Sequence, residues 1–195
     1  NFKSNIFELA VRAELSLFTS RVGHRYGIKK TLSRRHKGKS SEFIVFAGVG
    51  GFYFNPKGKN PSTGRWEKLY PLRTEGQGLP GGPKKYSRIS ISIPVGIAYR
   101  VVLNKLWCVG IEACYRKTFT DYIDDVSTVY YDNEAIRAAY GDVAAYFADP
   151  STTSTREAPI KGGTNPGEKR GETTYNDSFM FAWLNVSYKI TGTTK

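Results

Sequence analysis

The sequence predicts an all-β fold, namely a transmembrane antiparallel up-and-down β-barrel, and three observations carry that prediction. Five segments alternate apolar and polar residues, which is the period of a β-strand with one apolar face. Aromatic residues make up 14% of the 195 residues and glycine is abundant, as expected for strands and turns. No segment approaches the roughly 20 consecutive apolar residues that a transmembrane helix needs. We therefore expect any membrane crossing to be made by strands.

The five alternating segments are longer than the strands of most globular proteins. They lie near residues 7–17, 43–54, 89–101, 107–119 and 178–190. Most are about twice the five or six residues of a typical strand, and they match tilted strands that cross a bilayer with some overhang. We expect their apolar residues to face lipid: Phe7, Leu9, Val11, Leu15 and Leu17; Ile89, Ile91, Ile93, Val95, Ile97, Tyr99 and Val101; Trp107, Val109, Ile111, Tyr115 and Phe119; Met180, Leu184, Val186, Tyr188 and Ile190.

The opposite faces of the strands combine small residues with charges of both signs. The charged residues are Glu8, Arg12, Glu14, Glu112 and Arg116. Side chains fill the lumen of a small barrel, and opposite charges can pair there. We therefore expect this set to form a polar cluster inside the barrel. A soluble lipocalin-like barrel would invert the pattern. The aromatic residues at strand ends, such as Trp107 and Tyr188, favour membrane interfaces instead.

The connections between the predicted strands differ in length. Asn104 and Lys105 indicate a tight hairpin, whereas residues 55–85 and 120–176 form long links. If the last strand ends at the periplasm, as in bacterial barrels, both long links are extracellular loops. Within the second, residues 133–148 have helical spacing and predict one short loop helix broken by Gly141.

The strand count leads to an expectation about the whole chain. Five strands are too few to close a barrel, whose smallest common bacterial form has eight strands. We expect one domain over residues 1–195, integral to the bacterial outer membrane, with the N-terminal part of the barrel absent from this chain.

The net charge of +12 is concentrated in one run between Arg21 and Lys39, which no acidic residue interrupts. A solvated loop is one interpretation of such a run. The other is a periplasmic docking surface for an acidic partner or for lipid phosphate, and nucleic acid is not expected as the partner. The residues proposed for docking are Arg21, Arg25, Lys29, Lys30, Arg34 and Arg35.

No motif predicts catalysis. Cys108 and Cys114 lie on one face of a strand, about 20 Å apart, too far to form a disulfide with each other. Asp121, Asp124 and Asp125 are weak candidates for calcium, but their spacing is not that of an EF-hand, and turn capping explains them better. We expect no enzyme activity, no cofactor and no small-molecule substrate, and we expect outer-membrane lipid or lipopolysaccharide as a partner.

Three phrases carry a resemblance to a known family: FAGVGGFYFNP at residues 46–56, LRTEGQG at 72–78 and RKTFTDYIDDVS at 116–127. With residues 5–9 and the last strand, they resemble the PorG family, the outer-membrane barrel of the type IX secretion system of Bacteroidota. The resemblance covers nearly the whole chain and implies about three further strands before it. It also implies a non-catalytic role, in which the barrel associates with the periplasmic ring of the lipoprotein PorK and of PorN.

Three other functions remain open from the residues alone. A small porin would conduct ions, although charge pairs in a narrow lumen would block it. A soluble barrel that binds lipid or nucleic acid would extract without detergent, and nucleic-acid binding would weaken with salt. A surface adhesin would depend on the long loops.

Overall fold

The structure is a computed structural model that describes residues 2–21, 40–104, 106–150 and 164–188. It is mostly antiparallel β-sheet with short helical segments, so the all-β prediction is confirmed. The strands are β1 (Phe2–Arg21), β2 (Ser40–Lys59), β3 (Trp66–Lys68), β4 (Ile89–Val102), β5 (Trp107–Thr118) and β6 (Ser178–Tyr188). The helices are η1 (Tyr70–Leu72, a 3-10 turn), α1 (Asn133–Tyr140) and α2 (Asp142–Ala148).

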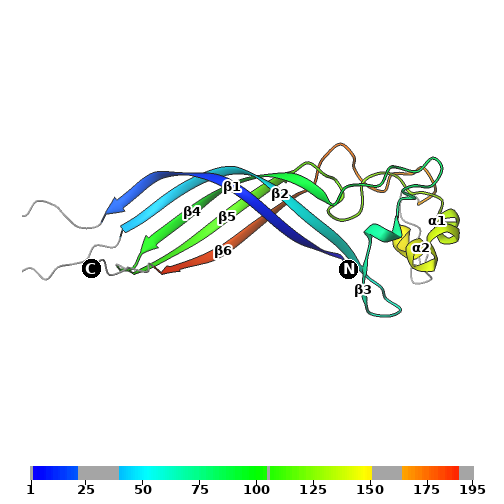
Figure 1. Cartoon of the computed structure of the whole chain (residues 1–195), viewed down its shortest axis with the longest axis horizontal. Helices are drawn as coiled ribbons and strands as arrows, with labels where there is room; N and C mark the ends of the chain where they lie inside the picture. Colours follow the sequence, from blue (N-terminus) through cyan, green and yellow to red (C-terminus); the bar gives the residue numbers. More distant parts are fainter. Residues whose placement is uncertain (1, 22–39, 105, 151–163, 189–195) are drawn as a thin grey trace, which may run out of the picture. The chain divides into compact units, whose positions relative to one another are not determined.

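The strands form one sheet whose hydrogen-bonded order is β1-β2-β4-β5-β6, with β3 paired to β2. Successive long strands run in opposite directions (Figure 1). In the ladder between β5 and β6, Trp107 lies opposite Tyr188 and Lys117 lies opposite Ser178. Among the described residues, β1 and β6 stand at the two ends of this order.

The five predicted strands are all present, and they differ from prediction mainly in extent. β1 and β2 each span 20 residues and continue past the regular alternation on which the prediction rested. The three-residue strand β3 is too short to show a period, which is why the sequence did not indicate it. The predicted turn after β4 is built by Asn104, whose side-chain oxygen accepts the N–H groups of Leu106 and Trp107 at 2.8 and 3.0 Å.

Where the sequence predicts one broken helix, the structure has two. Gly141 has φ 87° and ψ 173°, a conformation that side chains with a Cβ rarely adopt, and it separates α1 from α2. The carboxylate of Asp132 caps α1 by accepting the N–H groups of Glu134 and Ala135. Ile136 is fully buried with Ala144 and Ala148 beneath it, against Leu72 and Leu79 among other residues.

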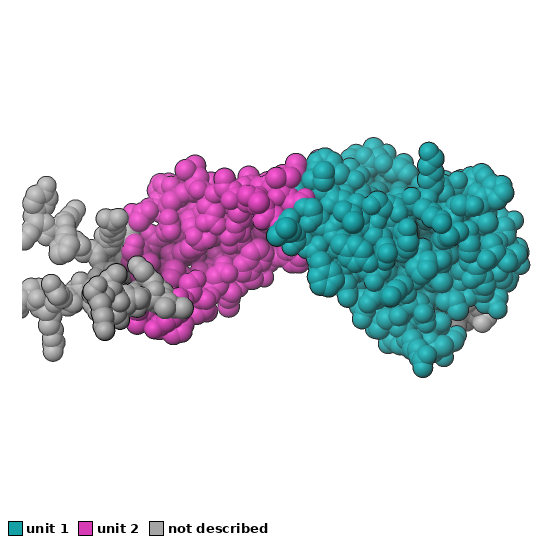
Figure 2. All heavy atoms as spheres, in the orientation of Figure 1, with its two compact units in different colours: residues 1–9, 51–92, 118–177 teal, residues 10–50, 93–117, 178–195 magenta. Residues whose placement is uncertain are grey.

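Contacts divide the chain into two compact units, coloured separately in Figure 2. Unit 1 comprises residues 1–9, 51–92 and 118–177, and unit 2 comprises residues 10–50, 93–117 and 178–195. Unit 2 contains a small apolar cluster of Ile44, Phe46, Ala98 and Cys114, with Trp183 packed against it. No helix in the described ranges is long and apolar enough to span a membrane.

The sheet of unit 2 is curled. Arg12 of β1 bonds to Glu112 of β5, although β2 and β4 lie between these strands in the sheet order. In a flat sheet the backbones of β1 and β5 would be roughly 14 Å apart, three strand spacings. Direct contact between the two side chains therefore places them on a concave face.

Candidate functional site

One face of each long strand presents apolar side chains to the surroundings, and we call it the outer face. In unit 2, Leu15 is 62% exposed, Ile111 53% and Leu184 80%. Contiguous apolar exposure on this scale marks a contact surface in soluble and membrane proteins alike. The exposed large apolar residues of this face in unit 2 are Val11, Leu15, Leu17, Val49, Ile93, Val95, Ile97, Tyr99, Trp107, Ile111, Tyr115, Met180, Leu184, Val186 and Tyr188.

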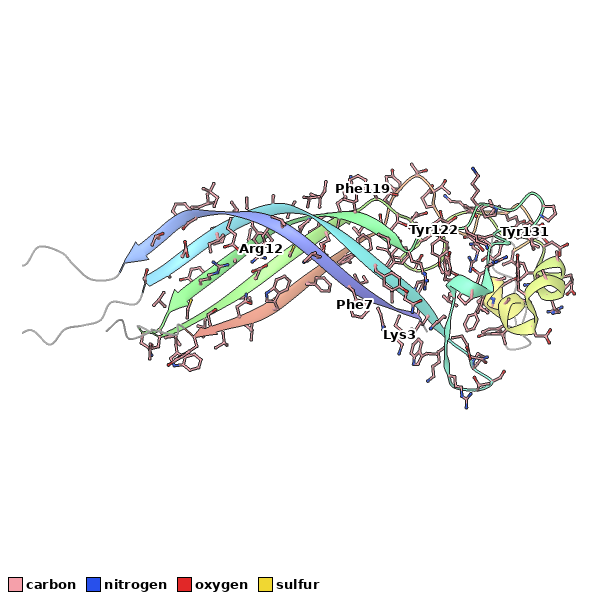
Figure 3. All side chains as sticks on the ribbon, viewed as in Figure 1. Lys3, Phe7, Arg12, Phe119, Tyr122 and Tyr131 are labelled. Carbon is pink, nitrogen blue, oxygen red and sulfur yellow. The ribbon has the colours of Figure 1, made fainter. Side chains whose placement is uncertain are left out.

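The opposite, inner face of unit 2 carries a charge cluster, which includes Arg12 (Figure 3). Arg12 makes a bidentate pair with Glu112, with Nη2 and Oε2 3.1 Å apart, and Glu112 is almost fully buried. Arg12 also lies 2.8 Å from Glu14, and Arg100 lies 3.0 Å from the other oxygen of Glu14. The guanidinium of Arg12 rests 4.4 Å above the ring of Phe46. Alternating charges thus neutralise one another across three strands of this face.

The structure brings together, through ion pairs, three of the charged residues predicted to cluster. Arg12, Glu14 and Glu112 meet, and Arg100 joins them although the prediction omitted it. Arg100 lies on the same face of β4 as the buried Ser92 and Ala98, and this alternation in the sequence could have identified it.

Two further predicted members, Glu8 and Arg116, contact polar and aromatic side chains. Glu8 lies in unit 1, where its carboxylate accepts the hydroxyl of Ser92 at 2.5 Å. Arg116 lies among aromatic rings of β6, 5.0 Å from the ring centroid of Phe181. Cys108 and Cys114 lie on the same face of β5, where Cys114 is buried and Cys108 is half-buried.

The loops of unit 1 are joined by a buried ion pair between Glu75 and Arg170. Oε1 of Glu75 accepts the N–H groups of Ser127 and Thr128 at 2.8 and 3.0 Å, and Oε2 accepts the hydroxyl of Thr128. Nη1 of Arg170 lies 3.2 Å from Glu75 and also donates to the carbonyl of Asp125. Glu75 is fully buried and Arg170 nearly so, so the pair ties three separate loop segments together away from water.

Asp125 forms the second centre of this loop network. It is buried, with φ 69°, and its carboxylate accepts the hydroxyls of Thr74 at 2.7 Å and Tyr86 at 2.5 Å. Burial raises the pKa of Asp125 to about 6, because the charged form loses solvation. Burial and the neighbouring Asp125 also raise the pKa of Tyr86, whose ring stacks 4.4 Å from that of Tyr122.

The carboxylates considered for calcium have separate roles. Asp125 serves the loop network, and Asp124 accepts the N–H of Val126 at 3.0 Å in a local turn. Burial raises the pKa of Asp121 and of Asp124 above the ordinary value, because the charged form loses solvation. No group of three or more His, Cys, Asp or Glu residues suited to a metal occurs within the described ranges.

The predicted docking residues lie mostly outside the described residues. Arg21 is the last residue of β1, while Arg25, Lys29, Lys30, Arg34 and Arg35 are not described.

Sequence reasoning missed most of the loop network. Glu75 and Arg170 are 95 positions apart, and no local pattern announces a pair at that separation. The one available hint was that Glu75 and Asp125 both stand inside phrases quoted for the family resemblance. No protein-family model, curated protein or solved structure matches the chain.

Proposed function

We propose that this chain is the greater part of an outer-membrane β-barrel and acts as a non-catalytic component of the type IX secretion system. The observation that carries the membrane part is the inverted distribution of polarity in unit 2. Leu184 is 80% exposed on the outer face, whereas Glu112 is 1% exposed on the inner face. A water-soluble sheet would place these residues the other way round, because burying charge and exposing leucine both cost free energy in water.

The secretion part of the proposal rests on the resemblance to the PorG family. Two of the quoted phrases, residues 72–78 and 116–127, meet in the loop network through Thr74, Glu75, Asp125 and Ser127. The two phrases therefore pack against each other in unit 1. In this proposal the barrel ties the periplasmic ring of PorK and PorN to the outer membrane, through the basic residues between Arg21 and Arg35.

The charge cluster on the inner face favours an anchor over a pore. Arg12, Glu14 and Glu112 fill the concave side of the sheet with paired charges, which would obstruct a narrow lumen. A conductance measurement in planar bilayers separates the two functions: the proposed anchor passes no steady current, and a porin does.

Co-purification tests the partner assignment. An affinity-tagged full-length protein, extracted from its native outer membrane in detergent, should retain PorK and PorN. Replacing the six basic residues Arg21, Arg25, Lys29, Lys30, Arg34 and Arg35 by glutamate should release the ring. The matched control replaces Lys84 and Lys85, two exposed lysines of unit 1, by glutamate and should retain it. Retention of the ring by both variants would show that the basic loop does not hold it.

A further inference from the structure

Four lysines and one tryptophan occupy the outer face of unit 1 around the hairpin of β2 and β3. Lys57 lies opposite Lys68 in the ladder, and Lys59 lies opposite Trp66. Directly opposite residues share a face of the sheet, with Cβ atoms about 5 Å apart. The fourth lysine, Lys3 of β1, extends its ammonium over the Trp66 ring at 4.0 Å from the ring centroid. We call these five residues the lysine collar.

The hairpin holds this arrangement in place. The N–H of Asn60 donates to the carbonyl of Arg65 at 2.8 Å, and the N–H of Gly64 donates back to Asn60 at 2.8 Å. Gly64 has φ 67°, which glycine adopts without steric cost. The collar is therefore displayed on a defined turn.

The charges of the collar lack carboxylate partners in the described part of the chain. None of its lysines is within ion-pair distance of a carboxylate among the described residues. Glu67, the acidic residue of β3, lies opposite Gly58 and points to the other face. Like charges placed directly opposite, such as Lys57 and Lys68, repel each other and destabilise a ladder. An external anion between them would convert that repulsion into attraction.

The collar borders an exposed apolar surface on the same face of unit 1. Phe7 is 69% exposed and Leu9 84% on β1, in step with Lys3, and Ile89 and Ile91 are exposed on β4. Figure 3 labels Lys3 and Phe7 on β1. Along β1, the outer face changes from phenylalanine at Phe7 to lysine at Lys3 within about 13 Å. A tryptophan and lysines at the border of an apolar band are typical of the level of lipid headgroups.

We propose that the lysine collar binds the phosphate groups of a phosphorylated lipid in the membrane around the barrel. The inference rests on the proposed membrane location and adds to it a partner and a binding site. Each lysine near a lipid surface attracts anionic headgroups, and ammonium groups bind phosphate as point charges. A lipid would satisfy both features of this surface, because its phosphates would meet the lysines while its acyl chains cover the adjoining apolar residues Phe7 and Leu9.

The test uses the full chain reconstituted into three kinds of vesicle. The first contains phosphatidylcholine alone, the second adds bisphosphorylated lipid A, and the third adds dephosphorylated lipid A. Flotation measures insertion, and the lipid A retained after detergent extraction and affinity purification measures binding. We expect retention of the phosphorylated form only. The variant Lys59→Gln with Lys68→Gln should weaken that retention by a factor on the order of ten.

The control variant Lys84→Gln with Lys85→Gln removes the same charge from unit 1 outside the collar and should retain lipid A like the unchanged chain. Equal retention by the two variants would overturn the proposal, as would equal retention of phosphorylated and dephosphorylated lipid. Displacement of lipid A by inorganic phosphate or by polyglutamate at comparable low concentrations would also overturn it, because the collar would then recognise a free anion or an acidic polypeptide. Failure to float with phosphatidylcholine alone refutes the membrane location itself, whereas flotation without lipid preference refutes the collar alone.

Discussion

Glu75 is a charged residue that the loops of unit 1 shield completely from water. Its carboxylate accepts two backbone N–H groups and one hydroxyl, and it neutralises Arg170. Replacement by alanine would leave the buried guanidinium of Arg170 without the carboxylate that it pairs with. Removing one partner of a buried pair costs about 3–5 kcal/mol.

We therefore expect Glu75→Ala to loosen the loops of unit 1. Amide hydrogen exchange should speed up at residues 125–128 and 170–171, while exchange in the β5–β6 ladder stays slow. The control Glu134→Ala removes an exposed partner of Arg137 and should leave exchange at those loop residues unchanged, since surface pairs contribute little. Unchanged exchange in Glu75→Ala would mean that apolar contacts alone hold the loops.

Two carboxyl groups give the loops of unit 1 a defined response to pH. Burial raises the pKa of Asp125 to about 6 and that of Asp177 to about 6, both above the ordinary value of 3.8. Between about pH 4 and pH 6, the folded chain therefore keeps these protons, whereas the unfolded chain has released them. The stability from this source is full below about pH 4 and is lost as the pH rises through about 6.

Thermal unfolding followed between about pH 4 and pH 7 should thus show the loops becoming less stable as the pH rises. Asp125→Asn keeps a polar side chain that cannot titrate, so its unfolding should depend less on pH, with the remainder due to Asp177, Asp121 and Asp124. Asp142→Asn, at a carboxylate that is 91% exposed, should behave like the unchanged chain. A slope that Asp125→Asn fails to reduce would assign the response to other groups.

At the scale of the elements, β4 depends on a glycine for close packing. A Cβ at Gly96 would lie 2.3 Å from Cζ of Phe46 and 2.4 Å from the carbonyl oxygen of Ala113. Phe46 is nearly fully buried and the carbonyl belongs to the β5 backbone, so neither can move away easily.

Gly96→Ala should accordingly lower the free energy of unfolding by about 1–3 kcal/mol, the usual cost of overpacking. Urea unfolding followed by tryptophan fluorescence would measure it. Gly51→Ala in β2 is the matched control, because a Cβ there meets nothing within 4 Å and should cost nothing. Equal midpoints for the two variants would show that Phe46 can repack.

The strands were predictable from the sequence because their pattern is local. Every second residue of β4 and β5 is apolar, and that alternation survives in the structure as exposed and buried faces. The break between α1 and α2 was equally readable, since Gly141 is where a helix tolerates a left-handed φ. β3 escaped prediction because its three residues cannot show a period.

The candidate site was less predictable than the strands, for a physical reason. Alternate residues of a strand lie on opposite faces, so the face of a residue can be assigned from its position in the strand. Arg12 and Glu112 were correctly placed on the same face of the sheet. Which charges touch depends on the curl of the sheet and on loop closure, and neither has a local signature. Arg100 was therefore omitted, and the pair of Glu75 with Arg170 was not foreseen.

For the whole molecule, the decisive property is whether the outer face meets lipid or water. Leu184 and Asn185 are neighbours on β6 that point to opposite faces, the leucine 80% exposed on the outer one. In a bilayer, Leu184→Arg would place a charge among acyl chains at a cost of about 2–4 kcal/mol near the midplane. In water, the same change would remove an exposed apolar group and improve solubility.

We expect Leu184→Arg to reduce insertion into phosphatidylcholine vesicles, measured by flotation and by protection from protease. Asn185→Arg should insert more readily than Leu184→Arg. If Leu184→Arg instead kept the protein dispersed without detergent, the chain would be a water-soluble sheet. The two substitutions add the same charge one residue apart, so the difference between them reports the environment of the outer face alone.

The contact between Arg12 and Glu112 also bears on the timing of assembly. The two residues are 100 positions apart, and two intervening strands must be in register before their side chains can meet. Closing so long a loop early in folding would cost more conformational entropy than the free energy of one ion pair can offset. The pair is therefore a late event, formed once the strands between are aligned. Weakening it should speed unfolding more than it slows folding, so the pair would prolong the lifetime of the finished sheet without guiding its formation.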